Sequence, residues 1–275
     1  MPIALFELLC LAVVAATLAA MARTRDARAL SADYAALSVA AWVGEESCVL
    51  LYRYYEYAGS WHARLDQVPL LVPLIWPLVV LSARDAARAV WPAAGPWLPA
   101  CLVAFDASLV EVVAVRAGLW RWAEPGHLGV PLVGILGWGF FAVGAVAMVG
   151  APRRRWLAIV AGPLAAHALI LASWWGVFRR LPRVDLGALG FLALAAASLV
   201  FLVGALRARA RGTLLPPSVW GPRVLAAGLF VALLGVTAPT DRALWLHAAL
   251  VAAPWLVLTG TRSAAAPRAA IARSR

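Results

Sequence analysis

Four carboxyl side chains stand inside long apolar runs of the sequence and are its first candidates for chemistry: Glu45, Glu46, Asp106 and Glu111. An ionisable group within a membrane-spanning segment costs about 2.5–3.5 kcal/mol on insertion scales, so each one calls for a partner or a purpose. A carboxyl group that stays protonated in such a place is the acid needed to protonate a weak base. The adjacent pair Glu45 and Glu46 fits this role best, with Asp106 or Glu111 orienting a water molecule.

The spacing of these residues limits how they can meet. Trp42 precedes the glutamate pair by three and four residues, so its indole shares a helix face with at least one carboxyl group. Asp106 and Glu111 are five residues apart, which places them about 140° apart around a helix. A packing role remains open for all four carboxyl groups, through an ion pair with Arg53 or Arg116 or a hydrogen bond to a neighbouring helix.

Aromatic residues gather in the same half of the chain. Residues 52–73 and 118–138 mix aromatic, charged, Gly and Pro residues, and each contains Val-Pro-Leu before an apolar run, so the two regions resemble an internal echo. Aromatic belts at the membrane surface explain many such rings, but π-faces also stabilise cations. The candidate substrate-binding residues are Trp42, Tyr54, Tyr57, Trp76, Trp120, Trp122 and Trp138.

The sequence lacks the residue patterns that several kinds of chemistry require. The four histidines stand alone, without the HxxxH or HxxHH spacing of a di-iron site. The sequence has no DDxxD cluster for Mg²⁺ and diphosphate, and no Walker or dinucleotide-binding motif. The formal charge of +11 comes from arginine clusters between bilayer-length segments, with no single basic face. We therefore expect no metal, cofactor or nucleic acid.

The elements that must position these residues are transmembrane helices. Apolar residues make up 64% of the chain and charged residues 13%, against about 25% charged in average proteins. A spanning helix needs about 20 mostly apolar residues, which predicts an all-α, polytopic bundle of eight or nine spans in a cell membrane. The predicted spans are 3–21, 34–52, 67–82, 97–116, 129–149, 156–177, 186–206, 222–239 and 243–261.

The chain is expected to form a single transmembrane domain over residues 1–262, with the chemistry in residues 40–140. Residues 263–275 are rich in Ala and Arg and are predicted to be a disordered tail near membrane lipid. With the N-terminus outside, the inside loops hold about twice as many arginines as the outside loops, which favours this orientation.

The order of motifs over residues 40–140 resembles the membrane-integral carotenoid biosynthesis family that includes the carotenoid hydratases. The matching features are the Glu45-Glu46 pair, the tyrosines at 52–57, the Val-Pro-Leu segments at 68 and 130, the acids at 106 and 111, and the Gly118-Leu119-Trp120-x-Trp122 segment. This chain departs from the family pattern at residues 47–51 and at 134–136.

The resemblance implies hydration of a terminal C=C bond on an acyclic carotenoid end, giving a tertiary alcohol without a cofactor. Carotenoid cyclisation shares the protonation step and ends in proton loss. A proton-coupled transporter would also use intramembrane acids, and a non-catalytic assembly subunit would bind the pigment without converting it. The residues alone leave these alternatives open.

Overall fold

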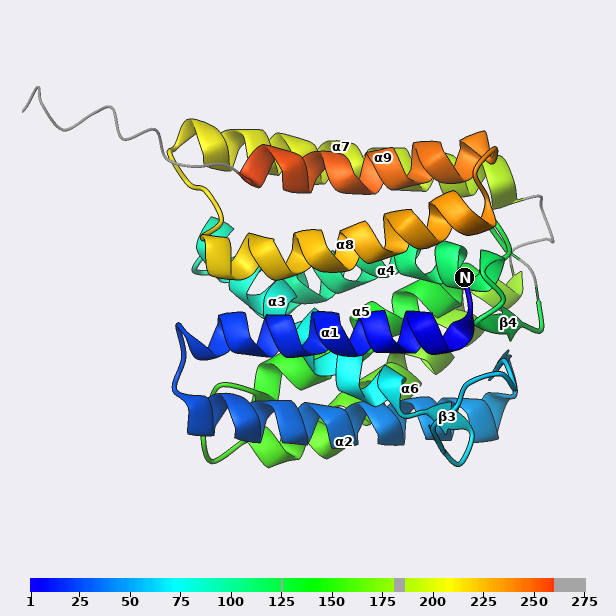
Figure 1. Ribbon diagram of the computed structural model, residues 1–275, viewed down its shortest axis with the longest axis horizontal. Coiled ribbons are helices and arrows are strands. Elements are labelled where there is room, and N and C mark those ends of the chain that lie inside the picture. Colours follow the sequence, from blue (N-terminus) through cyan, green and yellow to red (C-terminus); the bar gives the residue numbers. More distant parts are fainter. Residues whose placement is uncertain (125, 181–185, 260–275) are drawn as a thin grey trace, which may run out of the picture.

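The computed structural model of the protein describes residues 1–124, 126–180 and 186–259 (Figure 1). Within these ranges the chain forms an α-helical bundle in which long helices lie side by side. Its α-helices are α1 (Ile3–Ala22), α2 (Ala27–Tyr52), α3 (Leu71–Val90), α4 (Trp97–Arg116), α5 (Leu132–Met148), α6 (Ala158–Gly176), α7 (Leu186–Ala210), α8 (Pro217–Thr237) and α9 (Arg242–Leu258). The all-α prediction is confirmed, and each of the nine predicted segments corresponds to one of these helices.

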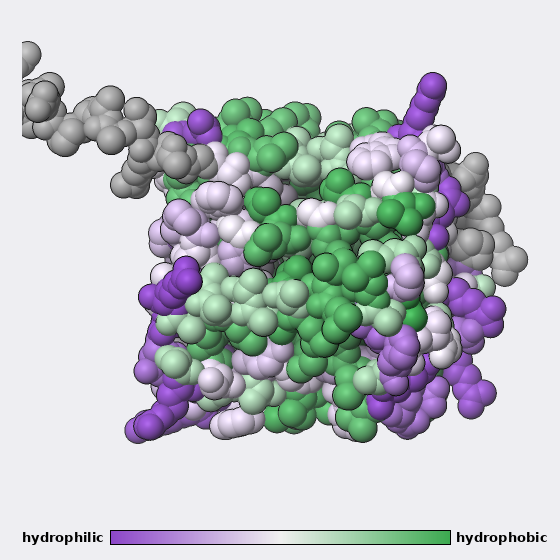
Figure 2. All heavy atoms as spheres, in the orientation of Figure 1, coloured by the Kyte–Doolittle hydropathy of each residue, from purple (hydrophilic) through white to green (hydrophobic). Residues whose placement is uncertain are grey.

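Six apolar stretches among the described residues are long enough to cross a membrane. They are α1, α2, α4, residues 155–180 around α6, residues 188–210 of α7, and α8. The apolar helices α5 and α9 are shorter, with 17 residues each, and α3 carries Arg84, Asp85 and Arg88 near its end. Figure 2 shows a broad hydrophobic face between hydrophilic ends. These features indicate a membrane protein.

Helix caps explain one displaced boundary. The Asp26 side chain accepts a hydrogen bond of 2.7 Å from the backbone N–H of Ala29, which satisfies a donor that the first helical turn leaves free. Helix α2 therefore begins at Ala27, seven residues before the predicted start. This capped extension includes Asp33, which pairs with Arg155 at a distance of 3.4 Å.

Short strands occupy the boundary regions that the hydropathy pattern could not resolve. Strand β1 (Tyr55–Tyr57) pairs antiparallel with β4 (Trp120–Trp122), and β2 (Arg64–Leu65) pairs with β3 (Val68–Pro69). Because β3 takes up residues 68 and 69, the predicted span 67–82 actually begins at Leu71 and continues to Val90. The two regions that resemble each other in sequence, residues 52–73 and 118–138, also lie side by side, since β1 comes from the first and β4 from the second.

Close helix packing fixes α5 within the bundle. A Cβ atom at Gly144 would collide with the carbonyl oxygen of Ala161 on α6, and one at Gly139 would lie 3.0 Å from the carbonyl oxygen of Ala100 on α4. Glycine at these positions lets the helix backbones approach closely, as is common between membrane helices. Helix α5 is thereby held against both α4 and α6.

Candidate functional site

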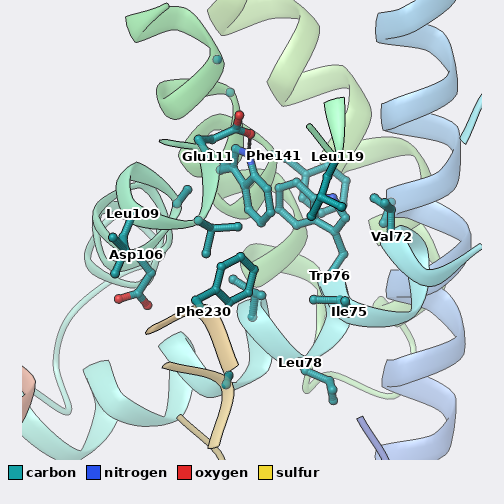
Figure 3. Close-up of a pocket in the computed structure, with 18 of the residues that line it drawn as sticks. Val72, Ile75, Trp76, Leu78, Asp106, Leu109, Glu111, Leu119, Phe141 and Phe230 are labelled. Carbon is teal, nitrogen blue, oxygen red and sulfur yellow. Dashed lines mark hydrogen bonds between the residues drawn. The ribbon is translucent and has the colours of Figure 1, made fainter. Parts of the chain in front are cut away.

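A cavity of ≈ 660 Å³ lies inside the bundle and is walled mainly by apolar side chains (Figure 3). Its lining comes from α1 to α6, α8, α9 and the β1–β4 ribbon. Three of the four predicted carboxyl groups, Glu45, Asp106 and Glu111, line this cavity. The sequence separation of Asp106 and Glu111 still places them at different parts of the wall, as Figure 3 shows.

The β1–β4 ribbon carries four of the aromatic rings at one end of the cavity. Its register pairs Tyr55 with Trp122 and Tyr57 with Trp120, and all four side chains line the cavity. Alternate residues of a strand point to opposite faces, and Glu56 forms an ion pair with Arg121 on the other, exposed face. The ribbon therefore has an aromatic inner face and a charged outer face.

Glu45 accepts three hydrogen bonds from aromatic side chains. Its Oε2 atom accepts from the hydroxyl groups of Tyr55 and Tyr57, the latter at 2.8 Å. Its Oε1 atom accepts from Nε1 of Trp76 at 2.8 Å. Glu45 on α2 is thus joined to the ribbon and to α3.

Glu111 on α4 also accepts three hydrogen bonds, and all of them come from tryptophan. Trp120 and Trp122 donate to Oε2 at 2.9 and 3.1 Å, while Trp138 on α5 donates to Oε1 at 2.7 Å. The Trp138 ring stacks on the Trp76 ring with centroids 4.2 Å apart. Because Trp76 bonds Glu45 and Trp138 bonds Glu111, this stack connects the two carboxyl groups. We call the two glutamates with Tyr55, Tyr57, Trp76, Trp120, Trp122 and Trp138 the carboxyl cage.

The donors differ in a way that separates the two glutamates. An indole N–H can only donate, whereas a tyrosine hydroxyl can either donate or accept. The partners of Glu111 therefore favour its ionised form. Glu45 can carry a proton and still keep its partners, because a tyrosine hydroxyl can turn and accept from it. Neither glutamate forms an ion pair with any described residue.

The tyrosines of the ribbon are held in their neutral form. Burial, followed by the nearby Glu45, raises the pKa of both Tyr55 and Tyr57 well above 10.0. Burial and the adjacent Glu124 raise the pKa of Tyr54 to about 12. The hydroxyl groups that face Glu45 therefore keep their protons throughout the physiological pH range.

Asp106 belongs to a second polar cluster in the cavity wall. It accepts a hydrogen bond of 2.9 Å from Nε1 of Trp255 on α9 and forms an ion pair with Arg223 on α8. Arg223 also donates to Oγ of Ser82 on α3 at 3.0 Å and lies over the Trp255 ring. The expected partners Arg53 and Arg116 are not used for Asp106, and Arg116 pairs with Asp241 instead. We call Ser82, Asp106, Arg223 and Trp255 the ion-pair station.

Two predicted site residues lie outside the cavity lining. The Glu46 carboxylate accepts a hydrogen bond of 3.1 Å from the backbone N–H of Gln67, and the Trp42 indole donates to the carbonyl oxygen of Leu65 at 3.3 Å. Both contacts fasten the β2–β3 hairpin to α2. The neighbouring glutamates Glu45 and Glu46 thus point to different surroundings, and Trp42 accompanies Glu46. Tyr54 does line the cavity, and its ring lies edge-on to Trp122.

Comparison of the chain with protein-family models, with curated proteins and with solved structures finds no match. In the described part of the chain, no group of three or more His, Cys, Asp or Glu side chains is arranged to hold a metal ion. The described His167 instead bonds Ser47 and Tyr52 at 2.8 and 2.7 Å.

Three important residues were missed from the sequence. Tyr55 donates to Glu45, and Arg223 and Trp255 hold Asp106. Strand alternation could have found Tyr55, because it shares a strand face with Tyr57. Nothing local identifies Arg223, which lies 117 residues from its aspartate.

Proposed function

We propose that this protein is a membrane enzyme that hydrates a terminal C=C bond of an acyclic carotenoid end, giving a tertiary alcohol without a cofactor. The observation that carries the proposal is the carboxyl cage. It places two glutamates, neither ion-paired with a described residue, in one aromatic wall of a large apolar cavity. Such a site suits an apolar substrate that becomes positively charged during the reaction.

Glu45 acts as the general acid in this mechanism. Its protonated carboxyl group transfers a proton to the less substituted carbon of the double bond, and the π electrons form the new C–H bond. The other carbon becomes a tertiary cation. The negative faces of the cage rings and the Glu111 carboxylate stabilise this cation in surroundings with little water.

Glu111 completes the addition. A water molecule attacks the cation to form the C–O bond, and Glu111 takes the proton that the water oxygen loses. The overall change is the addition of one H and one OH, with no electron transfer. Return of the proton from Glu111 to Glu45 restores the starting state. The roles follow from the donors around each carboxyl group, since only Glu45 has partners that can accept a hydrogen bond from its protonated form.

We also propose that the protein lies in a cell membrane. In this arrangement all nine described helices cross the bilayer, the N-terminus lies outside, and the carboxyl cage lies toward the outer surface. The short helices α5 and α9 are apolar enough to cross with modest local adjustment of the bilayer. An elongated substrate would enter the cavity from the lipid.

The experiment uses the full chain in lipid nanodiscs that contain an acyclic carotenoid, in water enriched in ¹⁸O and with a metal chelator. We expect a product heavier by one water that carries the heavy oxygen. A product that contains a new ring and has the same mass as the substrate would show that the reaction is cyclisation and not hydration. No conversion, or a strict requirement for a reductant, would refute the acid mechanism. Movement of an unmodified solute with protons into sealed liposomes that contain the protein would favour the transporter.

A further inference from the structure

The cavity wall contains a polar site that the proposed hydration does not use. The ion-pair station joins α3, α4, α8 and α9, whereas the carboxyl cage joins α2 to α5 and the ribbon. On α4 their acids are five residues apart, which is about 7.5 Å along the helix axis. In Figure 3 the Asp106 carboxylate points away from Glu111, and Leu109 and Phe230 lie nearby. An apolar stretch of wall therefore separates two polar sites.

Arg223 has unused hydrogen-bonding capacity. A guanidinium group has five N–H donors, and the described contacts commit one on Nη1 to Ser82 and one on Nη2 to Asp106. The Arg223 side chain is 14% exposed and it lines the cavity. Leaving such donors without an acceptor in an apolar cavity is unfavourable. We therefore expect the remaining N–H donors of Arg223 to bind an oxygen atom within the cavity.

The charge of the station selects among oxygen-bearing groups. Asp106 neutralises Arg223, and a carboxylate or phosphate brought to the guanidinium would also approach the aspartate. A hydroxyl group avoids this repulsion, because it can accept from Arg223 and donate to a free lone pair of Asp106. Both oxygens of Asp106 have lone pairs beyond those used by Arg223 and Trp255.

We propose that the ion-pair station binds a neutral oxygen group, preferably a hydroxyl, on an elongated and otherwise apolar ligand whose double bond lies in the carboxyl cage. This inference deepens the proposed function by specifying the substrate class as a chain oxygenated at a distance from the reacting bond. The ligand binding that it predicts can be measured whether or not water addition occurs.

The test compares three acyclic isoprenoid probes of one chain length: geranylgeraniol, the hydrocarbon with the same chain, and the corresponding carboxylic acid. Binding to the full-length protein in nanodiscs is followed by quenching of tryptophan fluorescence, with empty nanodiscs as the reference for partition into lipid. The alcohol should bind about tenfold more tightly than the hydrocarbon, as expected for a hydrogen bond to a charged group. It should also bind more tightly than the acid.

The variants separate recognition from structure. Asp106→Leu combined with Arg223→Met removes both charges without leaving one unpaired, and it should abolish the preference for the alcohol while hydrocarbon binding is kept. Asp106→Asn keeps the shape and leaves the charge of Arg223 unbalanced, so the preference should shift toward the acid.

Equal binding of alcohol and hydrocarbon by the parent protein would overturn the inference. It would also be overturned if the preference persisted in the double variant, or if Asp106→Asn failed to favour the acid. Should the double variant not fold, the Asp106→Asn result decides by itself. A clear alcohol preference together with no water addition to the acyclic carotenoid would refute the proposed function and leave this inference standing.

Discussion

At the scale of single residues, two chemically identical side chains have different types of hydrogen-bond donor around them. Glu111 is surrounded by three indole N–H groups, which can only donate. Glu45 has two tyrosine hydroxyls and one indole, so it can hold a proton without losing its partners. In the proposed mechanism this difference between the neighbours, more than the identity of the acid, makes Glu45 the proton donor and Glu111 the carboxylate.

Gly134 gives a prediction at the same scale. A Cβ atom at this position would lie 2.5 Å from Cζ2 of Trp122, so Gly134→Ala should push the indole away from Glu111. Loss of a hydrogen bond to a charged group is worth roughly tenfold or more in turnover. Gly137→Ala is the matched control on the same helix, because its Cβ atom would meet Ile170 at an ordinary 3.7 Å.

Product formation and thermal melting are measured for both alanine variants. Gly134→Ala should lose turnover while Gly137→Ala behaves as the parent protein. Equal activity of the two variants would show that the position of Trp122 does not matter.

At the scale of elements, hydropathy predicted the helices well but could not predict their polar ends. The predicted span 97–116 has the same first and last residues as α4, because the length of the apolar run alone sets the ends of this helix. The ribbon could not be predicted, because β1 and β4 are separated by more than 60 residues and only long-range pairing makes them strands. For the same reason, helical spacing indicated that Trp42 accompanies a glutamate without indicating that this is Glu46.

The junction between α4 and α9 provides a test of pH dependence. Hydrogen bonds, first from Arg116 and then from the backbone N–H of Leu244, lower the pKa of Asp241 below 3.8. Because the pKa is lower in the folded state than in the unfolded state, the aspartate charge stabilises the fold at pH values above the ordinary aspartate pKa. This contribution is lost as the pH falls through the lowered pKa of the folded state. Asp241→Asn retains an N-cap residue but loses the ion pair.

The melting temperature of the Asp241→Asn variant should therefore drop by about 1–3 °C near pH 7, because exposed ion pairs contribute little. The difference from the parent protein should shrink near pH 3. A difference that stayed constant with pH would mean that the aspartate charge has no part in holding α9 to α4.

At the scale of the whole molecule, hydrophilic residues lie at the two ends of the bundle and a hydrophobic surface lies between them (Figure 2). The links from α1 to α2, from α3 to α4, from α5 to α6 and from α7 to α8 gather at one end, opposite the β1–β4 ribbon (Figure 1). In the proposed orientation this end lies in the cytoplasm, as the positive-inside rule predicts from the arginine count of the loops.

Reporter fusions after Arg64 and after Arg275 test this orientation. The fusion after Arg64 should report the outside, and the fusion after Arg275 the cytoplasm. If both reporters lie on one side, the number of spanning helices after Arg64 is even, whereas the proposed arrangement has seven, so that arrangement would be wrong. The predicted tail at residues 263–275 lies outside the described residues, so the structure leaves that prediction as it stands.

The measurement that tests the central claim most directly compares three substitutions, Glu45→Gln, Glu46→Gln and Glu111→Gln, by product yield and melting temperature in the same membranes. Glu45→Gln removes the transferable proton and should reduce turnover by about 10²- to 10⁴-fold, as expected for loss of general acid catalysis. Glu111→Gln should also lose turnover, because an amide cannot take the proton from water. Glu46→Gln should keep activity within a few-fold, since its carboxylate contacts Gln67 outside the cavity lining. Near-parental turnover by Glu45→Gln, or equal loss in folded Glu45→Gln and Glu46→Gln variants, would contradict the proposed site.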